Sequence, residues 1–342
     1  MKKNAVRLGL IMLLTFILLF FFLREVDLKE VLRYLADVNV FFFVLIVLLV
    51  PLHLVTRAAR WHFLLRHEKK GVRFFNMFAG NAIGFTVTSI FPGRLGEIVK
   101  PLYLAQKECM RKGFVVGTVV VERIFDIFSM CFLLGVFLLA RPLYASIFRV
   151  NPQAATSLIF WGKVGVALAT AMLLLCLSLY FFKDLTLRVV SFVLKPLPAK
   201  WTRKVLSLAD EFIEGLKFFH STGSVIAFAL MSLVVWLGIV FYYWLLFFAF
   251  HLQMPFFVLV PYVFLVMVGA SIPTPGMVGG FDYFSKLGMT SLYHLDANLA
   301  IGMTIVMHAV QILVTCLIGY AILWKEGLSL FQLKKMGETE SL

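Results

Sequence analysis

A succession of long apolar runs constrains this chain more than any other feature. A helix that crosses a bilayer needs about 20 apolar residues, and six runs approach that length, at 6–23, 40–56, 114–140, 157–182, 224–250 and 297–324. The chain is 61% hydrophobic with a mean hydropathy of +0.95. Lipid is the solvent that accepts so much apolar surface. We therefore expect an all-α polytopic membrane protein with about six full spans.

The net charge of +14 does not indicate a nucleic-acid partner, because the basic residues lie in short segments between the apolar runs. Basic connecting segments usually face the anionic cytoplasmic leaflet. Residues 57–73 hold six Lys or Arg and residues 183–223 hold seven. These counts place both segments in the cytoplasm, together with both termini. We expect a multi-pass protein of the inner (cytoplasmic) membrane whose first apolar run is an uncleaved helix rather than a signal peptide.

The predicted orientation is consistent along the whole chain only if each of two further segments starts and ends on the same side of the membrane. Residues 74–106 must do so in the cytoplasm and residues 256–296 outside. Each contains a Pro-Gly element, in "SIFPGRLGE" (89–97) and "SIPTPGMVGG" (271–280). Broken backbone at membrane depth is tolerated where protein or a wet cavity covers it. We predict two re-entrant helical hairpins, with structural breaks at Pro92, Gly93, Pro273, Pro275 and Gly279.

The hairpins share the pattern PGxxG and are separated by an odd number of spans, so they are expected to enter from opposite faces. This indicates an inverted repeat, with repeat A at about 40–140 and repeat B at about 224–324. Its binding site is expected near the midplane, where the broken helices meet. Chance recurrence of PGxxG is the alternative. The whole chain, 1–342, is interpreted as one integral-membrane domain, with a cytoplasmic amphipathic segment at 183–222.

Two charged residues, Arg94 and Glu97, follow the first break. A helix that restarts there would present free N–H groups and its positive dipole end, which together with Arg94 favour a phosphate. Glu97 would meet an amine or an arginine. The alternative is a shallow hairpin from which Arg94 extends to the cytoplasmic headgroups.

Glu122, Arg123 and Asp126 lie in the apolar stretch "VVVERIFDIF". Charges inside a membrane are costly and rare, so they indicate a functional site or a buried pair. Glu122 and Asp126 share a helix face, and Arg123 is within reach of Asp126. Two interpretations stay open: an internal salt bridge between helices, and a charged lining for a ligand.

The second break offers Thr274, the backbone after Gly276, Asp282 and His308. Pairing of Asp282 with Lys286 is the structural alternative, as is a packed role for His308. The chain contains no HExxH, GxSxG or Walker motif, and its four cysteines lack metal-ligand spacing. No enzymatic activity, metal or cofactor is therefore expected.

The stretches "GRLGEIVKPLYL" (93–104), "VVVERIFDIF" (119–128) and "PTPGMVGGFD" (273–282) resemble the lysylphosphatidylglycerol synthase transmembrane (flippase-like) family. This is the membrane half of the multiple peptide resistance factor. The resemblance spans about residues 5 to 325 and implies movement of lipids between leaflets. The matching positions are Arg94, Glu97, Glu122, Arg123, Pro275 and Gly276. The family's late motif commonly continues to Glu, where this chain has Asp282.

The leading hypothesis is a lipid flippase whose cargo headgroup enters a cavity between the hairpins. Arg94 and Arg123 would neutralise a phosphate, and the nearby carboxylates would meet any positive group. Membrane lipids are the expected partners. The alternatives are an integral-membrane transferase that uses a lipid-linked substrate and an accessory subunit of a separate lipid-modifying enzyme. Synthesis of aminoacyl lipid is not expected, because no soluble aminoacyltransferase domain follows the last apolar run.

Overall fold

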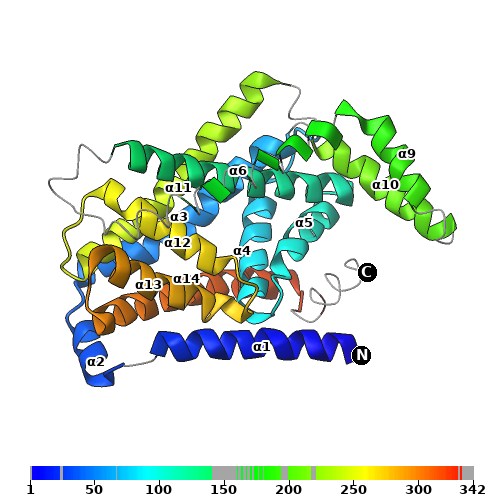
Figure 1. Cartoon of the computed structure of the whole chain (residues 1–342). Helices are drawn as coiled ribbons and strands as arrows, with labels where there is room; N and C mark the ends of the chain where they lie inside the picture. Colours follow the sequence, from blue (N-terminus) through cyan, green and yellow to red (C-terminus); the bar gives the residue numbers. More distant parts are fainter. Residues whose placement is uncertain are drawn as a thin grey trace.

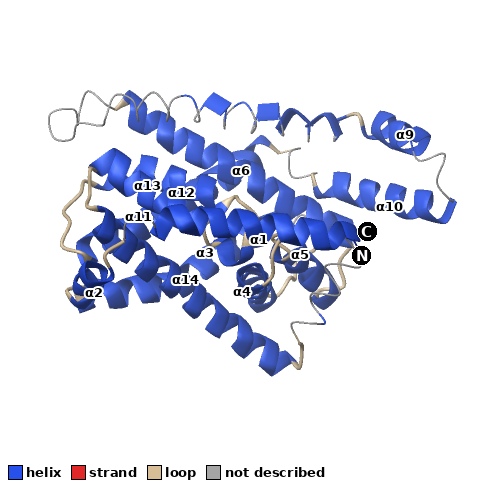
Figure 2. Cartoon of the chain, turned by 60° about the horizontal axis from the view of Figure 1, so that its bottom comes forward, coloured by secondary structure: helices blue, strands red, loops and turns tan. Residues whose placement is uncertain are grey.

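The computed structural model describes residues 2–23, 26–66, 68–140, 181–193, 199–216, 221–329 and 332, with scattered positions between 160 and 179. Every regular element in these residues is a helix (Figure 2). In chain order they are α1 (Lys2–Leu23), α2 (Leu28–Ala36), α3 (Val40–Leu65), α4 (Phe74–Ile90), α5 (Gly96–Lys107), α6 (Lys112–Leu139), α9 (Lys183–Val193), α10 (Ala199–Gly215), α11 (Thr222–Ala249), η2 (Phe256–Leu259), α12 (Val260–Ala270), η3 (Pro275–Met277), α13 (Gly280–Tyr293) and α14 (Ala297–Glu326).

Three of these helices, α3, α11 and α14, are long and apolar enough to cross a membrane. α6 has 28 residues but carries the three charges of "ERIFD". Large apolar side chains such as Phe16 and Leu317 are 70% and 69% exposed on the outside of the bundle, where lipid would cover them. The prediction of an all-helical, multi-pass membrane protein is thus confirmed. The number of spans remains a prediction, and the expected span 157–182 lies largely outside the described residues.

α3 extends well beyond the predicted span 40–56 and ends at Leu65. Its last two turns bury Trp61 and Leu64 at helical spacing, so the apolar stripe continues past the first arginine. Arg57 and Arg60, which the charge count assigns to a cytoplasmic loop, therefore lie inside the protein, 7% and 0% exposed. Lys100 of α5 is similarly buried, with 5% of its surface exposed.

The first hairpin consists of α4 and α5, which run antiparallel. A Cβ atom on Gly96 would lie 1.8 Å from the carbonyl oxygen of Gly84, so the two helices approach as closely as backbone allows near the tip. At the base, the Asn76 side chain and the Arg73 N–H donate to the Glu108 carboxylate at 2.7 and 3.0 Å. With 17 and 12 residues, α4 and α5 are about 26 and 18 Å long. Both are shorter than a hydrocarbon core of about 30 Å.

The second hairpin, α12 with α13, is built on the same plan. A Cβ atom on Gly269 would lie 2.5 Å from the Gly280 carbonyl oxygen near the tip. At the base, the Tyr293 hydroxyl donates to the Val258 carbonyl at 2.6 Å. The two hairpins thus share a glycine contact near the tip and a hydrogen-bonded base. Their inverted relation depends on the membrane orientation and remains a prediction.

The predicted amphipathic segment 183–222 contains two helices, α9 and α10, at the top right of Figure 1, away from α1. α10 packs against α6, where the N–H of Gly113 donates to Glu211 at 3.0 Å. Leu216 is buried with Leu64 and Val121 in one apolar cluster. Part of the apolar face of this segment therefore packs on protein.

Candidate functional site

The tips of the two hairpins meet. The backbone leaves the helix between Ile90 and Gly96 and again between Ala270 and Gly280. In each tip two consecutive residues have positive φ: 80° and 54° at Gly93 and Arg94, and 59° and 62° at Gly276 and Met277. A left-handed Arg is strained, and such strain collects at functional sites. The Gly93 N–H donates to the Pro273 carbonyl at 3.3 Å, and the Arg94 guanidinium donates to the Ala270 carbonyl.

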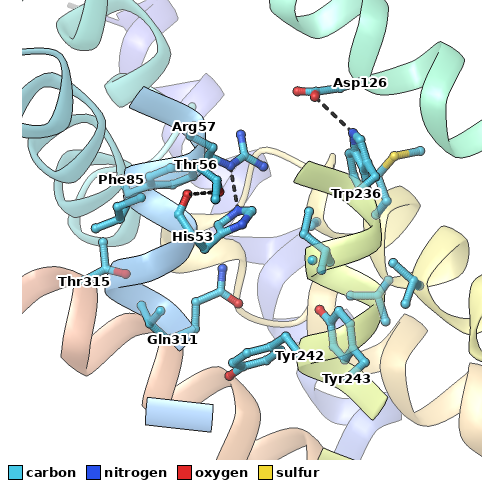
Figure 3. A pocket seen from close by; sticks show the side chains of 18 of the residues that line it. His53, Thr56, Arg57, Phe85, Asp126, Trp236, Tyr242, Tyr243, Gln311 and Thr315 are labelled. Atoms are coloured by element: carbon cyan, nitrogen blue, oxygen red, sulfur yellow. Dashed lines mark hydrogen bonds between the residues drawn. The ribbon is translucent and has the colours of Figure 1, made fainter. Parts of the chain in front are cut away.

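A cavity of about 490 Å³ lies beside this contact, and it is lined by the hairpin tips and by residues of α3, α4, α5, α6, α11, α12, α13 and α14. In Figure 3, Asp126 lies at its upper end, and Tyr242 and Gln311 lie at its lower end. Most of the lining is apolar or aromatic. The titratable side chains in the lining are His53, Arg57, Arg94, Glu97, Arg123, Asp126, Tyr242 and Tyr243.

Three buried ion pairs lie behind the polar lining. Arg60 donates to Asp126 at 2.6 Å and lies 3.5 Å from Glu122. Lys100 donates to the other oxygen of Glu122 at 2.5 Å, with its ammonium 4.2 Å from the centre of the Trp61 ring. Glu122 is fully buried and does not line the cavity. Of the two interpretations of Glu122, the geometry favours the internal salt bridge.

Arg123 and Asp126 do face the cavity. Arg123 lies 3.3 Å from Asp126 and 3.7 Å from Glu97, which connects α6 to the start of α5. The indole N–H of Trp236 also donates to Asp126, at 3.0 Å. The Nε atoms of both Arg123 and Arg94 are buried without a hydrogen-bond partner. Two of the predicted arginines therefore line the cavity, and each has a buried Nε donor that forms no hydrogen bond with the described residues.

Arg57 also lines the cavity, although it is not among the site residues predicted from the sequence. Its Nε donates to Nε2 of His53 at 2.7 Å, so the His53 ring accepts there and is neutral. Its guanidinium lies 5.3 Å from the centre of the Phe85 ring. Arg57 pairs with no carboxylate in the described part of the chain. Its spacing of four residues from His53, with Arg60 three further on, marks one face of a continuing helix and is the signal that could have found it.

The predicted residues of the second tip form hydrogen bonds that stabilise the backbone conformation of the break. His308 shares a 2.6 Å hydrogen bond with Asp282 and donates through Nε2 to the Gly276 carbonyl at 2.8 Å. The other Asp282 oxygen accepts from the Gly279 N–H at 2.8 Å. The expected partner of Asp282, Lys286, donates to the Phe22 carbonyl. Thr274 is 1% exposed, and its hydroxyl has no hydrogen-bond partner. Thr274, Gly276, Asp282 and His308 do not line the cavity.

Three of the backbone N–H groups predicted to be free after the first break have acceptors within the turn. The N–H of Glu97 donates to the Arg94 carbonyl, and those of Ile98 and Val99 donate to the Leu95 carbonyl. A tight turn before α5 thus uses these three groups. Among the described residues, no group of three His, Cys, Asp or Glu side chains is placed to hold a metal ion.

These features define a multi-pass helical membrane protein with a charged cavity at the junction of two broken hairpins. The chain belongs to the family described as Lysylphosphatidylglycerol synthase TM region, which it matches over residues 5–319. The predicted resemblance is confirmed. The chain is 22% identical over 330 residues to the UPF0104 membrane protein MJ1595 of Methanocaldococcus jannaschii, with 94% of this chain and 95% of that protein covered. No solved structure matches the chain. Membership links the protein to lipid modification or transport.

Proposed function

We propose that this protein moves a phospholipid or lipid-linked headgroup between the two leaflets of the membrane. The observation that carries this proposal is the cavity at the junction of the hairpin tips. The lining of this cavity combines arginine donors with mostly apolar side chains, and the surrounding helices expose apolar side chains to lipid. A lipid has the same two-part chemistry, with a charged headgroup and apolar chains.

The apolar side of the cavity supports a route for the acyl chains. Leu52 of α3 and Val234 and Phe241 of α11 line the cavity and are 52%, 62% and 38% exposed. They therefore connect the cavity lining with the lateral surface that lipid covers. In this mechanism the headgroup enters between α3 and α11 while the chains stay in the bilayer.

The hairpins provide the moving parts in this mechanism. Each is too short to cross the bilayer, and each enters from its own face, as expected for an inverted repeat. The tips are joined by the Gly93–Pro273 and Arg94–Ala270 hydrogen bonds, each worth about 1 kcal/mol net. Rocking of one hairpin against the other breaks these two hydrogen bonds and opens the cavity to each leaflet in turn.

The test is a leaflet-exposure assay in liposomes. Purified protein is reconstituted with a trace of acyl-labelled phospholipid, and an impermeant reductant bleaches the outer-leaflet label. We expect bleaching to exceed that of protein-free liposomes, with no change in lipid mass by mass spectrometry. Arg123→Ala abolishes the excess, whereas the control Arg66→Ala, at the exposed end of α3, keeps it. Equal bleaching with and without protein refutes the proposal, and a changed lipid mass indicates a transferase.

A further inference from the structure

Positive charge exceeds negative charge around the cavity. The charged cluster at the cavity and directly behind it holds five cations, Arg57, Arg60, Arg94, Lys100 and Arg123, and three carboxylates, Glu97, Glu122 and Asp126. His53 adds no charge, because it accepts a hydrogen bond from Arg57. Within the part of the chain that the structure describes, the cluster therefore has an excess of two positive charges.

The ion pairs show which cations carry the excess. Arg60 pairs with Asp126, Lys100 with Glu122, and Arg123 with Glu97. Arg57 and Arg94 have no carboxylate within ion-pair distance among the described residues, and both line the cavity. Arg57 is bonded to a neutral imidazole and Arg94 to a backbone carbonyl.

Two unpaired guanidinium groups in a largely apolar cavity are costly. Removing a charge from water without a partner costs several kcal/mol. An anion that enters the cavity offsets this cost, and guanidinium groups bind phosphate oxygens with charge-assisted, often bidentate hydrogen bonds. A zwitterionic headgroup brings no net charge, and a cationic headgroup increases the excess.

Building on the proposed function, we infer that the cavity selects lipids whose headgroup is a phosphomonoester or diphosphate with two negative charges and no compensating amine. A phosphomonoester carries about −1.5 to −2 charges at neutral pH, which matches the excess carried by Arg57 and Arg94. A phosphodiester such as phosphatidylglycerol carries one charge and matches half of it. Phosphatidylcholine matches none of it.

The experiment measures binding to the purified full-length protein in detergent by isothermal titration calorimetry. The probes are dioctanoyl phosphatidic acid, dioctanoyl phosphatidylglycerol, dioctanoyl phosphatidylcholine and glycerol 3-phosphate. We expect phosphatidic acid to bind at least about tenfold more tightly than phosphatidylglycerol, since tenfold corresponds to about 1.4 kcal/mol. Phosphatidylcholine binds most weakly among the lipids. Glycerol 3-phosphate, which lacks chains for the apolar lining, binds more weakly than phosphatidic acid.

Arg57→Gln tests the assignment of the excess charge, with Arg66→Gln as a matched control on the same helix. Arg57→Gln weakens binding of phosphatidic acid by about tenfold and reduces its advantage over phosphatidylglycerol, whereas Arg66→Gln changes neither. Gel filtration checks that both variants are folded, and the order of the lipids on the unmodified protein tests the inference without any variant.

Equal affinity for phosphatidic acid and phosphatidylcholine overturns the inference, as does an equal effect of the two substitutions. Binding of glycerol 3-phosphate as tight as that of phosphatidic acid assigns the site to soluble phosphates and overturns the lipid assignment. Selective binding without leaflet movement refutes the transport proposal but keeps the site. Leaflet movement without selectivity keeps the transport proposal and refutes this inference.

Discussion

The backbone N–H of Gly93 donates a hydrogen bond to the carbonyl oxygen of Pro273, 3.3 Å away. This bond joins the tips of two hairpins that are far apart in the sequence. Beside it, Arg94 reaches across to the carbonyl of Ala270. The two broken segments therefore form one structural unit, and the cavity with its unpaired arginines lies at their junction.

The strained backbone at Arg94 predicts a separation of stability from function. Arg94→Gly relieves a left-handed conformation that costs about 1–2 kcal/mol in a non-glycine residue and loses one hydrogen bond worth about 1 kcal/mol. We expect the thermal unfolding temperature in detergent to stay close to that of the unmodified protein. We expect leaflet movement of anionic lipid to fall by at least about tenfold. The reason is that removing the Arg94 charge weakens the interaction with the phosphate by about 1.4 kcal/mol or more.

The control for Arg94→Gly is Cys109→Gly. Cys109 has φ of 51° but lies exposed after α5, away from the cavity. This substitution also relieves strain, and we expect it to leave lipid movement unchanged. Normal lipid movement in the Arg94→Gly variant would remove Arg94 from the mechanism.

The ion pair between Glu122 and Lys100 indicates that Glu122, which lies at a family motif position, has a structural role. Glu122→Gln leaves Lys100 and Arg60 without this counter-charge, and we expect a loss of about 3–5 kcal/mol in unfolding free energy. The double variant Lys100→Met with Glu122→Gln loses less than the sum of the single variants, with a coupling of about 1–3 kcal/mol. The measurement is a double-mutant cycle of unfolding in detergent.

The same double variant removes one cation and one carboxylate, so the excess positive charge at the cavity is unchanged. It should keep the preference for phosphatidic acid over phosphatidylglycerol. Additive single effects would exclude the coupling of Lys100 with Glu122, and a lost lipid preference in a folded double variant would show that this pair contributes to binding of the cargo.

Glu108 predicts a pH dependence of stability at the base of the first hairpin, outside the spanning helices. Burial alone would raise the pKa of this carboxyl, but hydrogen bonds from Asn76, the Arg73 N–H and Lys69 hold its pKa below the ordinary value. A carboxyl whose folded pKa is depressed contributes stability above its unfolded pKa of about 4.3. That contribution is lost as the pH falls through the folded pKa.

The unfolding temperature of the protein should therefore fall between about pH 5 and pH 3, and Glu108→Gln should show a smaller fall. The control is Glu30→Gln, because Glu30 is an exposed residue whose ion pair with Arg33 spans 3.8 Å. The Glu30 variant should keep the pH dependence of the unmodified protein. Parallel curves for the Glu108 variant and the unmodified protein would exclude this role.

The inverted arrangement predicts opposite faces for two exposed loops. In a variant without the four native cysteines, a cysteine at Gly71 should react with an impermeant maleimide from the cytoplasmic side. A cysteine at Gln253 should react from the outside. The native Cys109, exposed at the base of the first hairpin, should react from the same side as position 71 when it alone is restored. Labelling of positions 71 and 253 from the same side would contradict the repeat.

The sequence alone predicts much of the fold, because apolar runs and Pro-Gly elements are local signals. The runs predict α3, α11 and α14, and the two PGxxG patterns coincide with the breaks after α4 and α12. The length of α3 is not predicted, because counting Lys and Arg assigns every charge next to an apolar run to a loop. Arg57 and Arg60 continue the helix because Trp61 and Leu64 pack on its buried face.

The partners in the site were harder to predict, because they come from distant elements. Arg60 meets Asp126 across 66 positions of the chain, and Lys100 meets Glu122 across 22. Sequence spacing favours pairs three or four residues apart, such as Asp282 with Lys286, over the contact between Asp282 and His308. Which charges stay unpaired at the cavity depends on these long-range contacts.

In the proposed mechanism, a lipid headgroup occupies the cavity at the hairpin junction. The most direct test is a cryo-electron microscopy map of the protein in nanodiscs that contain phosphatidic acid. We expect phosphate density within hydrogen-bond distance of both Arg57 and Arg94, with acyl-chain density leaving between α3 and α11. Lipid density confined to the outer surface, with Arg57 and Arg94 each paired to a carboxylate of the protein, would contradict it.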